Sequence, residues 1–262
     1  MIKVADILTL LEKTAPTHLA AGYDNVGHVV GRAGAEVKKV LIALDITGAV
    51  IEEAKEWGAE LIVSHHPVIF GERKKITDSD VTGELVLRLC ESGIAAICMH
   101  TNLDSAEGGV NDIFARKLGI SVEGAVEPCE DGIAGGGRYG DIVGKMSLDE
   151  FLGLVCKALS TKGVRFHDAK KPVRKVAVGG GSCGDYVIAA KELGCDTLVT
   201  ADVKHNQMLD AAHIGLNVID AGHFATEDIV CPYLEKVISD AFGGLEVRIA
   251  AADADCTQYY TL

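Results

Sequence analysis

Two adjacent histidines, His65 and His66, stand directly after an apolar run and before Pro67. The run at 61–63 is rich in β-branched residues, so it predicts a short buried strand that the proline ends. In α/β proteins, ligands bind at the carboxyl ends of the strands. Imidazoles placed there, next to carboxylates from other strand ends, are what a divalent metal ion requires. The histidine pair therefore predicts a metal site.

Candidate carboxylates and a third histidine follow two other predicted strands. The buried strand predicted at 94–99 leads to Asp104, and the strand predicted at 217–221 leads to His223 and Glu227. Because the carboxyl ends of such strands bind ligands together, these side chains are expected to reach one point in space. The candidate metal ligands are His65, His66, Asp104, His223 and Glu227.

The two halves of the chain match at a constant offset of 136 residues, the difference between Lys39 and Lys175. Segment 54–64 answers to segment 190–200 in the same register. Chance similarity between two βαβ units is one explanation, and a true duplication is the one we favour because the register has no gaps. The histidine pair aligns with an alanine and Asp202, so the site itself is not duplicated.

Alternating strand and helix patterns predict the fold class: α/β, with two pseudo-repeated domains whose sheets are mixed or mainly parallel and flanked by helices. The stretch 119–144 is rich in glycine and acidic residues, and we place the domain boundary near residue 125. Residues 147–150 carry the capping-box pattern of a helix start. A long helix is predicted over 226–241, with Thr226 as its cap.

Composition narrows the classes of partner. The chain has 262 residues and a formal net charge of −13, which argues against nucleic acid or an anionic membrane as a partner. Its eight cysteines include no C-x-x-C pair, a pattern typical of unpaired thiols in a reducing cytoplasm. The sequence contains no run of about 18 apolar residues, so it predicts no membrane span. We expect a soluble cytoplasmic protein.

Three spaced motifs resemble the signatures of the GTP cyclohydrolase 1 type 2-like family of dinuclear-metal proteins. They are Ser-His-His-Pro at 64–67, His-Thr-Asn-Leu-Asp at 100–104 and Gly-His-Phe-Ala-Thr-Glu at 222–227. Asp-Asn-Val-Gly at 24–27 fits as well, and the resemblance covers nearly the whole chain. It implies that the same five candidate residues bind two divalent metal ions. Mixed nitrogen and oxygen ligands suit Zn, Fe, Mn or Co without choosing among them.

The resemblance also implies two intertwined domains, with the C-terminal segment returning to the first. On this basis residues 1–125 plus 243–262 form the first α/β domain and residues 126–242 form the second. Members of the family are typically hexameric, so the resemblance implies a homohexamer that encloses a cavity onto which the metal sites open.

Within the implied dinuclear centre, Glu227 is expected to bridge the two ions, because a carboxylate has two oxygens. The ions would stand about 3.5–4 Å apart, as in other two-metal sites. His66 and Asp104 would complete the shell of one ion, and His65 and His223 the shell of the other.

Two classes of function remain open. One is a metal-dependent hydrolase acting on GTP or another small nucleotide or phosphate substrate, with His100 or His205 as proton shuttle. The other is a non-catalytic metal-binding or regulatory protein that interacts with other proteins. The glycine-rich segment 179–184 is either a phosphate cradle or a tight strand-to-helix turn. The turn is favoured because the segment lacks the Lys-Ser/Thr of a P-loop.

Overall fold

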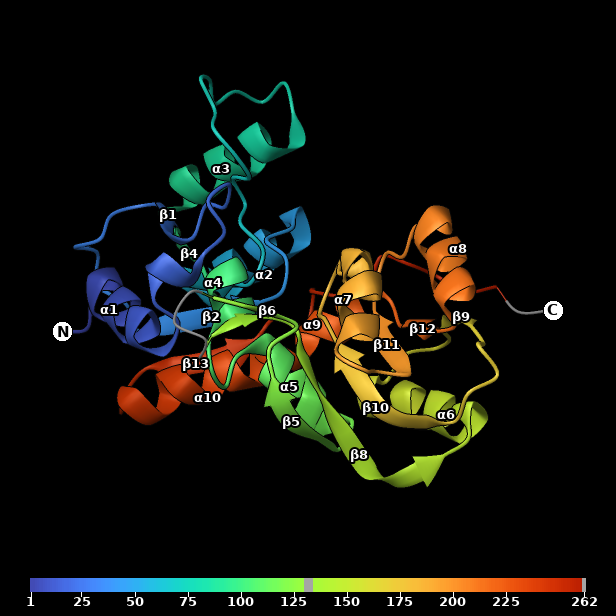
Figure 1. The fold of residues 1–262 in the computed structure, drawn as a ribbon. Coiled ribbons are helices and arrows are strands. Elements are labelled where there is room, and N and C mark those ends of the chain that lie inside the picture. Colours follow the sequence, from blue (N-terminus) through green and yellow to red (C-terminus); the bar gives the residue numbers. More distant parts are fainter. Residues whose placement is uncertain (130–133, 261–262) are drawn as a thin grey trace. The chain divides into compact units, whose positions relative to one another are not determined.

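The computed structural model (Figure 1) describes residues 1–129 and 134–260. The chain forms two compact units: Met1–Leu103 with Val230–Ala254, and Asp104–Ile229 with Asp255–Leu262. The sequence placed the second domain at 126–242, whereas helix 231–241 packs in the first unit. Residues 130–133, next to the predicted boundary, and 261–262, in the predicted tail, lie outside the described residues.

The first unit is built on a five-stranded mixed sheet in the order β1-β4-β3-β2-β13. Neighbouring strands run parallel apart from β1 and β4, which are antiparallel. The C-terminal strand β13 joins this sheet through parallel pairing with β2. The strands are β1 Gly27–Val30, β2 Lys39–Ala43, β3 Leu61–Ser64, β4 Ala95–Cys98 and β13 Glu246–Ile249.

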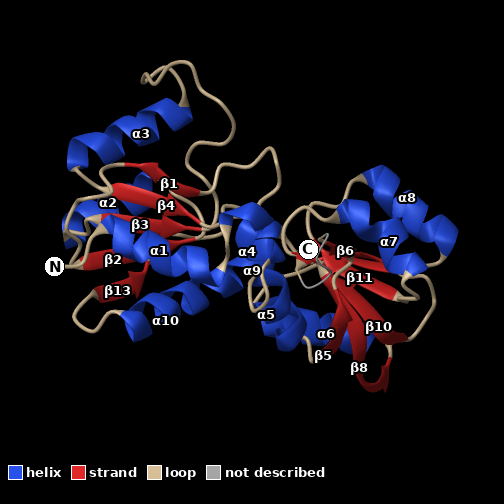
Figure 2. Cartoon of the chain, turned by 60° about the vertical axis from the view of Figure 1, so that its left-hand side comes forward, coloured by secondary structure: helices blue, strands red, loops and turns tan. Residues whose placement is uncertain are grey.

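Helices cover both faces of this sheet (Figure 2). Helices α2 and α3 pack together on one face, and α1 packs with α10 on the other. Helix α2 begins where the Thr47 hydroxyl accepts a hydrogen bond from the Val50 amide, and it ends at Gly58, whose φ is +77°. The helices are α1 Val4–Thr14, η1 Thr17–Leu19, α2 Gly48–Trp57, α3 Val81–Ser92, α4 Thr101–Ser105, which crosses the unit boundary, and α10 Cys231–Ala241.

The second unit contains a six-stranded mixed sheet in the order β5-β8-β10-β11-β12-β9. The central strands β10, β11 and β12 are parallel, and the outer pairings are antiparallel. The strands are β5 Ile120–Gly124, β8 Arg138–Met146, β9 Arg165–His167, β10 Val173–Val178, β11 Thr197–Thr200 and β12 Asn217–Asp220, with a separate hairpin of β6 Glu127–Pro128 and β7 Gly135–Gly136.

Alternation along β10 divides the second core into two layers. Val176 and Val178 join the cluster that contains Phe114 and Phe151, whereas Ala177 faces the opposite cluster. This is the two-residue period of a strand with helices on both faces. Accordingly α5 and α6 cover one face, and α7 and α8 the other (Figure 1). The helices are α5 Val110–Lys117, α6 Leu148–Leu159, η2 Gly184–Tyr186, α7 Val187–Glu192, α8 His205–Ile214, α9 His223–Glu227 and η3 Asp228–Val230.

The internal repeat reappears in the pairing registers. Val40 pairs with Leu61 between β2 and β3, and Val176 pairs with Thr197 between β10 and β11. Each second-unit position is the first-unit position plus 136, since 40 + 136 = 176 and 61 + 136 = 197. The mixed α/β fold class is confirmed, and the shared register supports a duplication.

The predicted helix over 226–241 is wrong in one respect. The structure divides this region into α9, η3 and α10, and Pro232 stands in the first turn of α10. A proline has no N–H to donate to the preceding turn, so a helix readily begins there and does not readily pass through. Thr226 lies inside α9, whose N-cap is Gly222, so Thr226 is not a cap. The capping box of Ser147 with Glu150 is confirmed.

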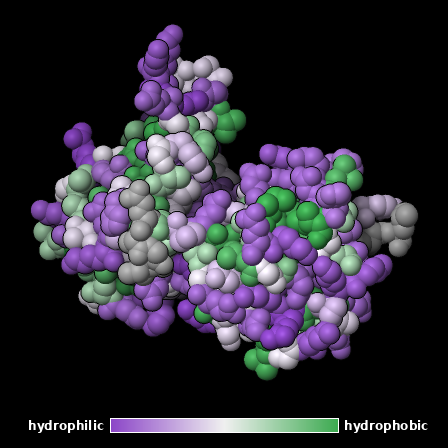
Figure 3. Space-filling view, in the orientation of Figure 1, coloured by the Kyte–Doolittle hydropathy of each residue, from purple (hydrophilic) through white to green (hydrophobic). Residues whose placement is uncertain are grey.

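Hydrophilic side chains cover most of the face drawn in Figure 3, with a smaller hydrophobic area over the region of α7 and α8. Among the described residues, the helices are all too short or too polar to cross a lipid bilayer. Cys90, Cys129, Cys156, Cys183, Cys195 and Cys256 are free thiols.

Candidate metal centre

Three histidines of the first unit form a cluster at the carboxyl ends of β3 and β4. The ring centroids of His65, His66 and His100 lie 5.1 to 5.4 Å from one another. One ring nitrogen from each lies within 4.8 Å of the others, a spacing that suits a metal ion. His65 and His66 follow β3 directly, and His100 follows β4, so parallel neighbouring strands bring the rings together. The structure therefore adds His100 to the predicted histidine pair.

The Nδ1 atoms of these histidines are all held by oxygen acceptors. His65 Nδ1 lies 2.7 Å from the Met99 carbonyl oxygen, and His66 Nδ1 lies 2.9 Å from Asp45 Oδ1. His100 Nδ1 lies 2.9 Å from Asp24 Oδ1. A carbonyl or an ionised carboxylate can only accept, so Nδ1 carries the proton and the lone pair of a neutral ring is on Nε2. Such an outer hydrogen bond is what orients a metal-binding histidine.

Asp24 is a strongly perturbed carboxyl of this cluster. Burial raises its pKa, but hydrogen bonds from His100 and Thr101 outweigh that effect and hold the pKa well below its usual range. The Thr101 amide donates to Asp24 Oδ2 at 3.0 Å. Asp24 is consequently a fixed anion at neutral pH, suited to holding His100 in one orientation.

The second unit places His223 and Glu227 together on α9. His223 Nε2 lies 2.9 Å from Glu227 Oε2, and His223 Nδ1 lies 2.6 Å from Asp202 Oδ2. The four-residue spacing on a helix puts the two side chains on one face. One carboxylate oxygen of Asp104 lies within 4.8 Å of one of Glu227. The predicted ligands of this unit therefore gather at one place.

The glycine-rich segment 179–184 is a tight turn against this carboxylate. Gly181 has a φ of +63°, and a Cβ added there would lie only 2.1 Å from Glu227 Oε1. The Gly180 amide donates to Asn111 Oδ1, the Gly181 amide to the Thr226 hydroxyl, and the Cys183 amide to the Thr200 hydroxyl. Because side chains already use these N–H groups, the turn does not present them to a phosphate. The tight-turn interpretation is confirmed.

Cys183 lies beside the same carboxylates. Burial, reinforced by the negative charges of Asp104 and Glu227, raises the pKa of its thiol to about 12. Its Sγ donates to the Gly180 carbonyl at 3.2 Å. The thiol is consequently protonated and unreactive at neutral pH.

The donor set of the described residues fits divalent metal ions. His65, His66, His100 and His223 are each oriented by a hydrogen bond at Nδ1. Gly181 leaves room for the Glu227 carboxylate, which lies beside His223 Nε2. His205 is the first residue of α8 and is exposed. Asp45 and Asp202 were not predicted from the sequence as orienting groups. Each of them follows a strand. Asp202 also occupies the repeat position of His66, and that alignment is the signal that could have identified it.

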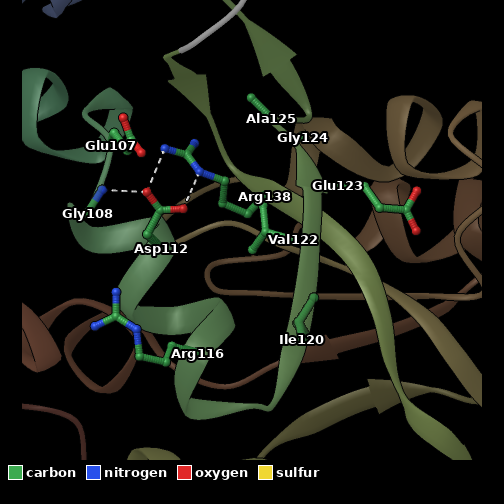
Figure 4. Close-up of a pocket in the computed structure, with 10 residues that line it drawn as sticks. All are labelled: Glu107, Gly108, Asp112, Arg116, Ile120, Val122, Glu123, Gly124, Ala125 and Arg138. Atoms are coloured by element: carbon green, nitrogen blue, oxygen red, sulfur yellow. Dashed lines mark hydrogen bonds and ion pairs between the residues drawn. The ribbon is translucent and has the colours of Figure 1, made fainter.

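A separate open cleft of about 580 Å³ lies in the second unit, between α5 and the edge strand β5 (Figure 4). Arg138 lines it, with Nε 2.6 Å from Asp112 Oδ1 and Nη1 2.7 Å from the Gly135 carbonyl. Arg138 is nearly buried and also donates to the Gly137 and Ala106 carbonyls. Its contacts are structural, and they join β8 to the loop before α5.

The fold and the oriented histidines define a two-unit α/β protein with candidate metal-ligand groups of His, Asp and Glu. The family model of Duf34/NIF3 (NGG1p interacting factor 3) matches residues 2–256, and the chain belongs to this family. It is 37% identical over 238 residues to the GTP cyclohydrolase 1 type 2 homolog of Clostridium perfringens, covering 90% of each chain. It is 33% identical to the Clostridium acetobutylicum homolog of that name, covering 86% of this chain and 85% of the other.

Several solved structures have the same fold as this chain. A hypothetical protein of Staphylococcus aureus matches with a TM-score of 0.91 and 28% identity, over 98% of this chain and 99% of that one. A Bacillus cereus protein related to NIF3 matches with a TM-score of 0.90 and 24% identity, over 99% of both chains. Reduced HcgD from Methanocaldococcus jannaschii matches with a TM-score of 0.80 and 28% identity, over 95% and 97%. The resemblance drawn from the motifs is confirmed.

Proposed function

We propose that this protein is a dinuclear-metal-dependent hydrolase acting on a small substrate. Its two divalent ions, of Zn, Fe, Mn or Co type, would be held by His65, His66, Asp104, His223 and Glu227. The observation that carries the proposal is that three of these residues are histidines whose Nδ1 atoms each face an oxygen acceptor. Structural histidines rarely need such uniform orientation, whereas metal-binding ones do.

The side chains of this chain divide the chemical work. Bound divalent ions would polarise a substrate oxygen and lower the pKa of water toward neutrality. Asp45 and Asp202 hold the imidazoles of His66 and His223 in the tautomer with a lone pair on Nε2. His100, oriented by Asp24, would accept a proton from a nucleophile or return it to a leaving group.

The names of the relatives suggest GTP or another nucleotide as substrate. Two observations weigh against a triphosphate, namely the net charge of −13 and the engaged amides of the turn at 179–184. They favour a second candidate, a non-catalytic metal-binding or regulatory protein that interacts with other proteins. The family description, which names an interacting factor, points the same way.

Metal analysis of the purified chain tests the metal proposal. We expect two ions per wild-type chain and a loss of at least one in Glu227→Ala, because the bridging carboxylate is removed. Glu192→Ala, an exposed glutamate on α7, is the matched control and should keep both ions. Full occupancy in Glu227→Ala would exclude the bridging role.

Turnover of GTP tests the reaction, with formate and phosphate measured separately. Formate released by the metal-loaded wild type, and not by a His65→Ala/His66→Ala variant, supports ring opening. Phosphate alone indicates a phosphohydrolase. His213→Ala, which removes an exposed histidine of α8, should behave as wild type. Absence of turnover over a panel of nucleotides and phosphoesters, despite full metal loading, would replace the hydrolase by the binding protein.

The family resemblance also supports a homohexamer in the cytoplasm as the working state. Free thiols such as those of Cys90 and Cys256 suit a reducing compartment. Light scattering should give the mass of six chains at micromolar concentration, and a monomer stable to dilution would contradict the assembly.

A further inference from the structure

Two exposed aromatic side chains stand beside the histidine cluster of the first unit. Tyr23 is 69% exposed and Phe70 is 60% exposed. Their ring centroids lie 6.3 Å apart at an interplanar angle of 61°. Phe70 in turn lies 6.3 Å from the His100 ring at 75°. The aromatic rings therefore form a continuous row from the surface to His100 of the histidine cluster.

Hydrogen bonds beside the cluster anchor the loops that carry these rings. Tyr23 belongs to a turn closed by the Asp24 amide, which donates to the Ala21 carbonyl at 2.9 Å. Asn25 Nδ2 donates to the Ile69 carbonyl at 2.8 Å, which ties this turn to the residue before Phe70. Each aromatic ring is thus adjacent in sequence to an anchored residue. The backbone that carries the two rings is therefore anchored.

Contact with water alone is unfavourable for an exposed Tyr–Phe pair, because each ring has a large apolar face. A planar ring gains most by offset stacking on such a face. The rings themselves carry no charge, so they offer a planar neutral ring a stacking partner whatever the charge of the rest of the chain. A ring stacked on Phe70 would have its edge toward His100, where polar heteroatoms find a partner.

We propose that Phe70 and Tyr23 form a stacking platform for a planar heteroaromatic ring of the substrate, with Phe70 as the stacking face and Tyr23 closing its outer edge. The platform specifies the substrate class of the proposed hydrolase and rests on that function for its biological role. Ring binding itself is independent of turnover, so the platform and the reaction fail separately.

The test is equilibrium binding of guanosine, which has the heteroaromatic ring and no phosphate, to the metal-loaded full chain. Ribose, which lacks the ring, is the matched probe and should not bind. Phe70→Leu should weaken guanosine binding about tenfold or more, in line with the loss of one base–aromatic stack. Phe70→Trp should retain the affinity, and Tyr23→Leu should weaken it less than Phe70→Leu.

Phe166→Leu supplies the matched control, since Phe166 is a 50% exposed phenylalanine on β9 of the other unit. It should bind guanosine as wild type does. Metal content and the circular dichroism spectrum should be unchanged in all variants. This control shows that the cluster and the fold are intact. If the metal-loaded chain binds guanosine but turns over none of the nucleotides and phosphoesters of the panel, the hydrolase is overturned and the platform stands.

Three results would overturn the platform. One is a wild-type chain that does not bind guanosine, and another is a Phe70→Leu variant that binds it as tightly as wild type. The third is a Phe70→Leu variant whose molecular mass falls in light scattering while its guanosine affinity is unchanged. In that case the rings would be a contact between copies of the chain.

Discussion

Gly181→Ala perturbs the candidate metal centre through a single methyl group. The added Cβ would stand 2.1 Å from Glu227 Oε1, 3.0 Å from its Cδ and 3.2 Å from His223 Nε2. Non-bonded heavy atoms are in contact at about 3.5 Å. The Glu227 carboxylate must therefore move by roughly 1 Å, away from the position in which it contacts His223 Nε2.

The energetic cost has two separable parts. An alanine in the left-handed conformation, here at a φ of +63°, costs about 1–2 kcal/mol of folding free energy. Displacing the carboxylate should lower metal affinity by about 100-fold, the upper end of the range found for groups that only orient ligands. The first part acts on stability and the second on metal binding.

Gly194→Ala separates these parts. Gly194 has a φ of +79°, in the same second unit, and no atom lies within 4 Å of the added Cβ. Urea denaturation of the metal-free proteins should show a loss of unfolding free energy for both variants, and a larger loss for Gly181→Ala because the contact with Glu227 adds to the backbone cost. Competition with a chromogenic chelator should show weakened metal binding for Gly181→Ala alone. Equal metal affinities in the two variants would refute the reasoning that Gly181 makes room for Glu227.

Two further predictions concern the described side chains. Arg138→Met should lower the free energy of unfolding by about 3 kcal/mol in urea denaturation, because it leaves the Asp112 charge without its buried partner. Arg174→Met, which breaks an exposed pair, should cost less than about 1 kcal/mol, and equal losses would contradict the role of burial. Burial raises the pKa of the Cys195 thiol to about 12, so at pH 8 iodoacetamide should label exposed Cys256 and spare Cys195 until the chain unfolds; equal labelling rates would disprove the shift.

The sequence by itself was enough for many of the elements and for the residue types of the site. Strands such as 61–64 and 197–200 are short apolar runs, and helix starts such as Ser147 are local hydrogen-bond patterns. Such signals depend on neighbouring residues, so they are readable without tertiary contacts. The repeat was visible for the same reason, and its register reappears in both sheets. The five-ligand set stays a prediction from strand ends and family motifs.

Only the tertiary structure decided which oxygens orient the histidines. Asp24 is 76 residues from His100, and Asp45 and Asp202 are each 21 residues from the histidine that they hold. The path of the loops sets these contacts, and loops have no periodicity from which to predict them.

The glycine-rich turn illustrates the same limit. Gly181 occupies the repeat position of Asp45, since 45 + 136 = 181, yet one makes room for Glu227 and the other holds His66. Equivalent backbone positions acquire opposite roles because a side chain's function depends on what the folded chain brings beside it.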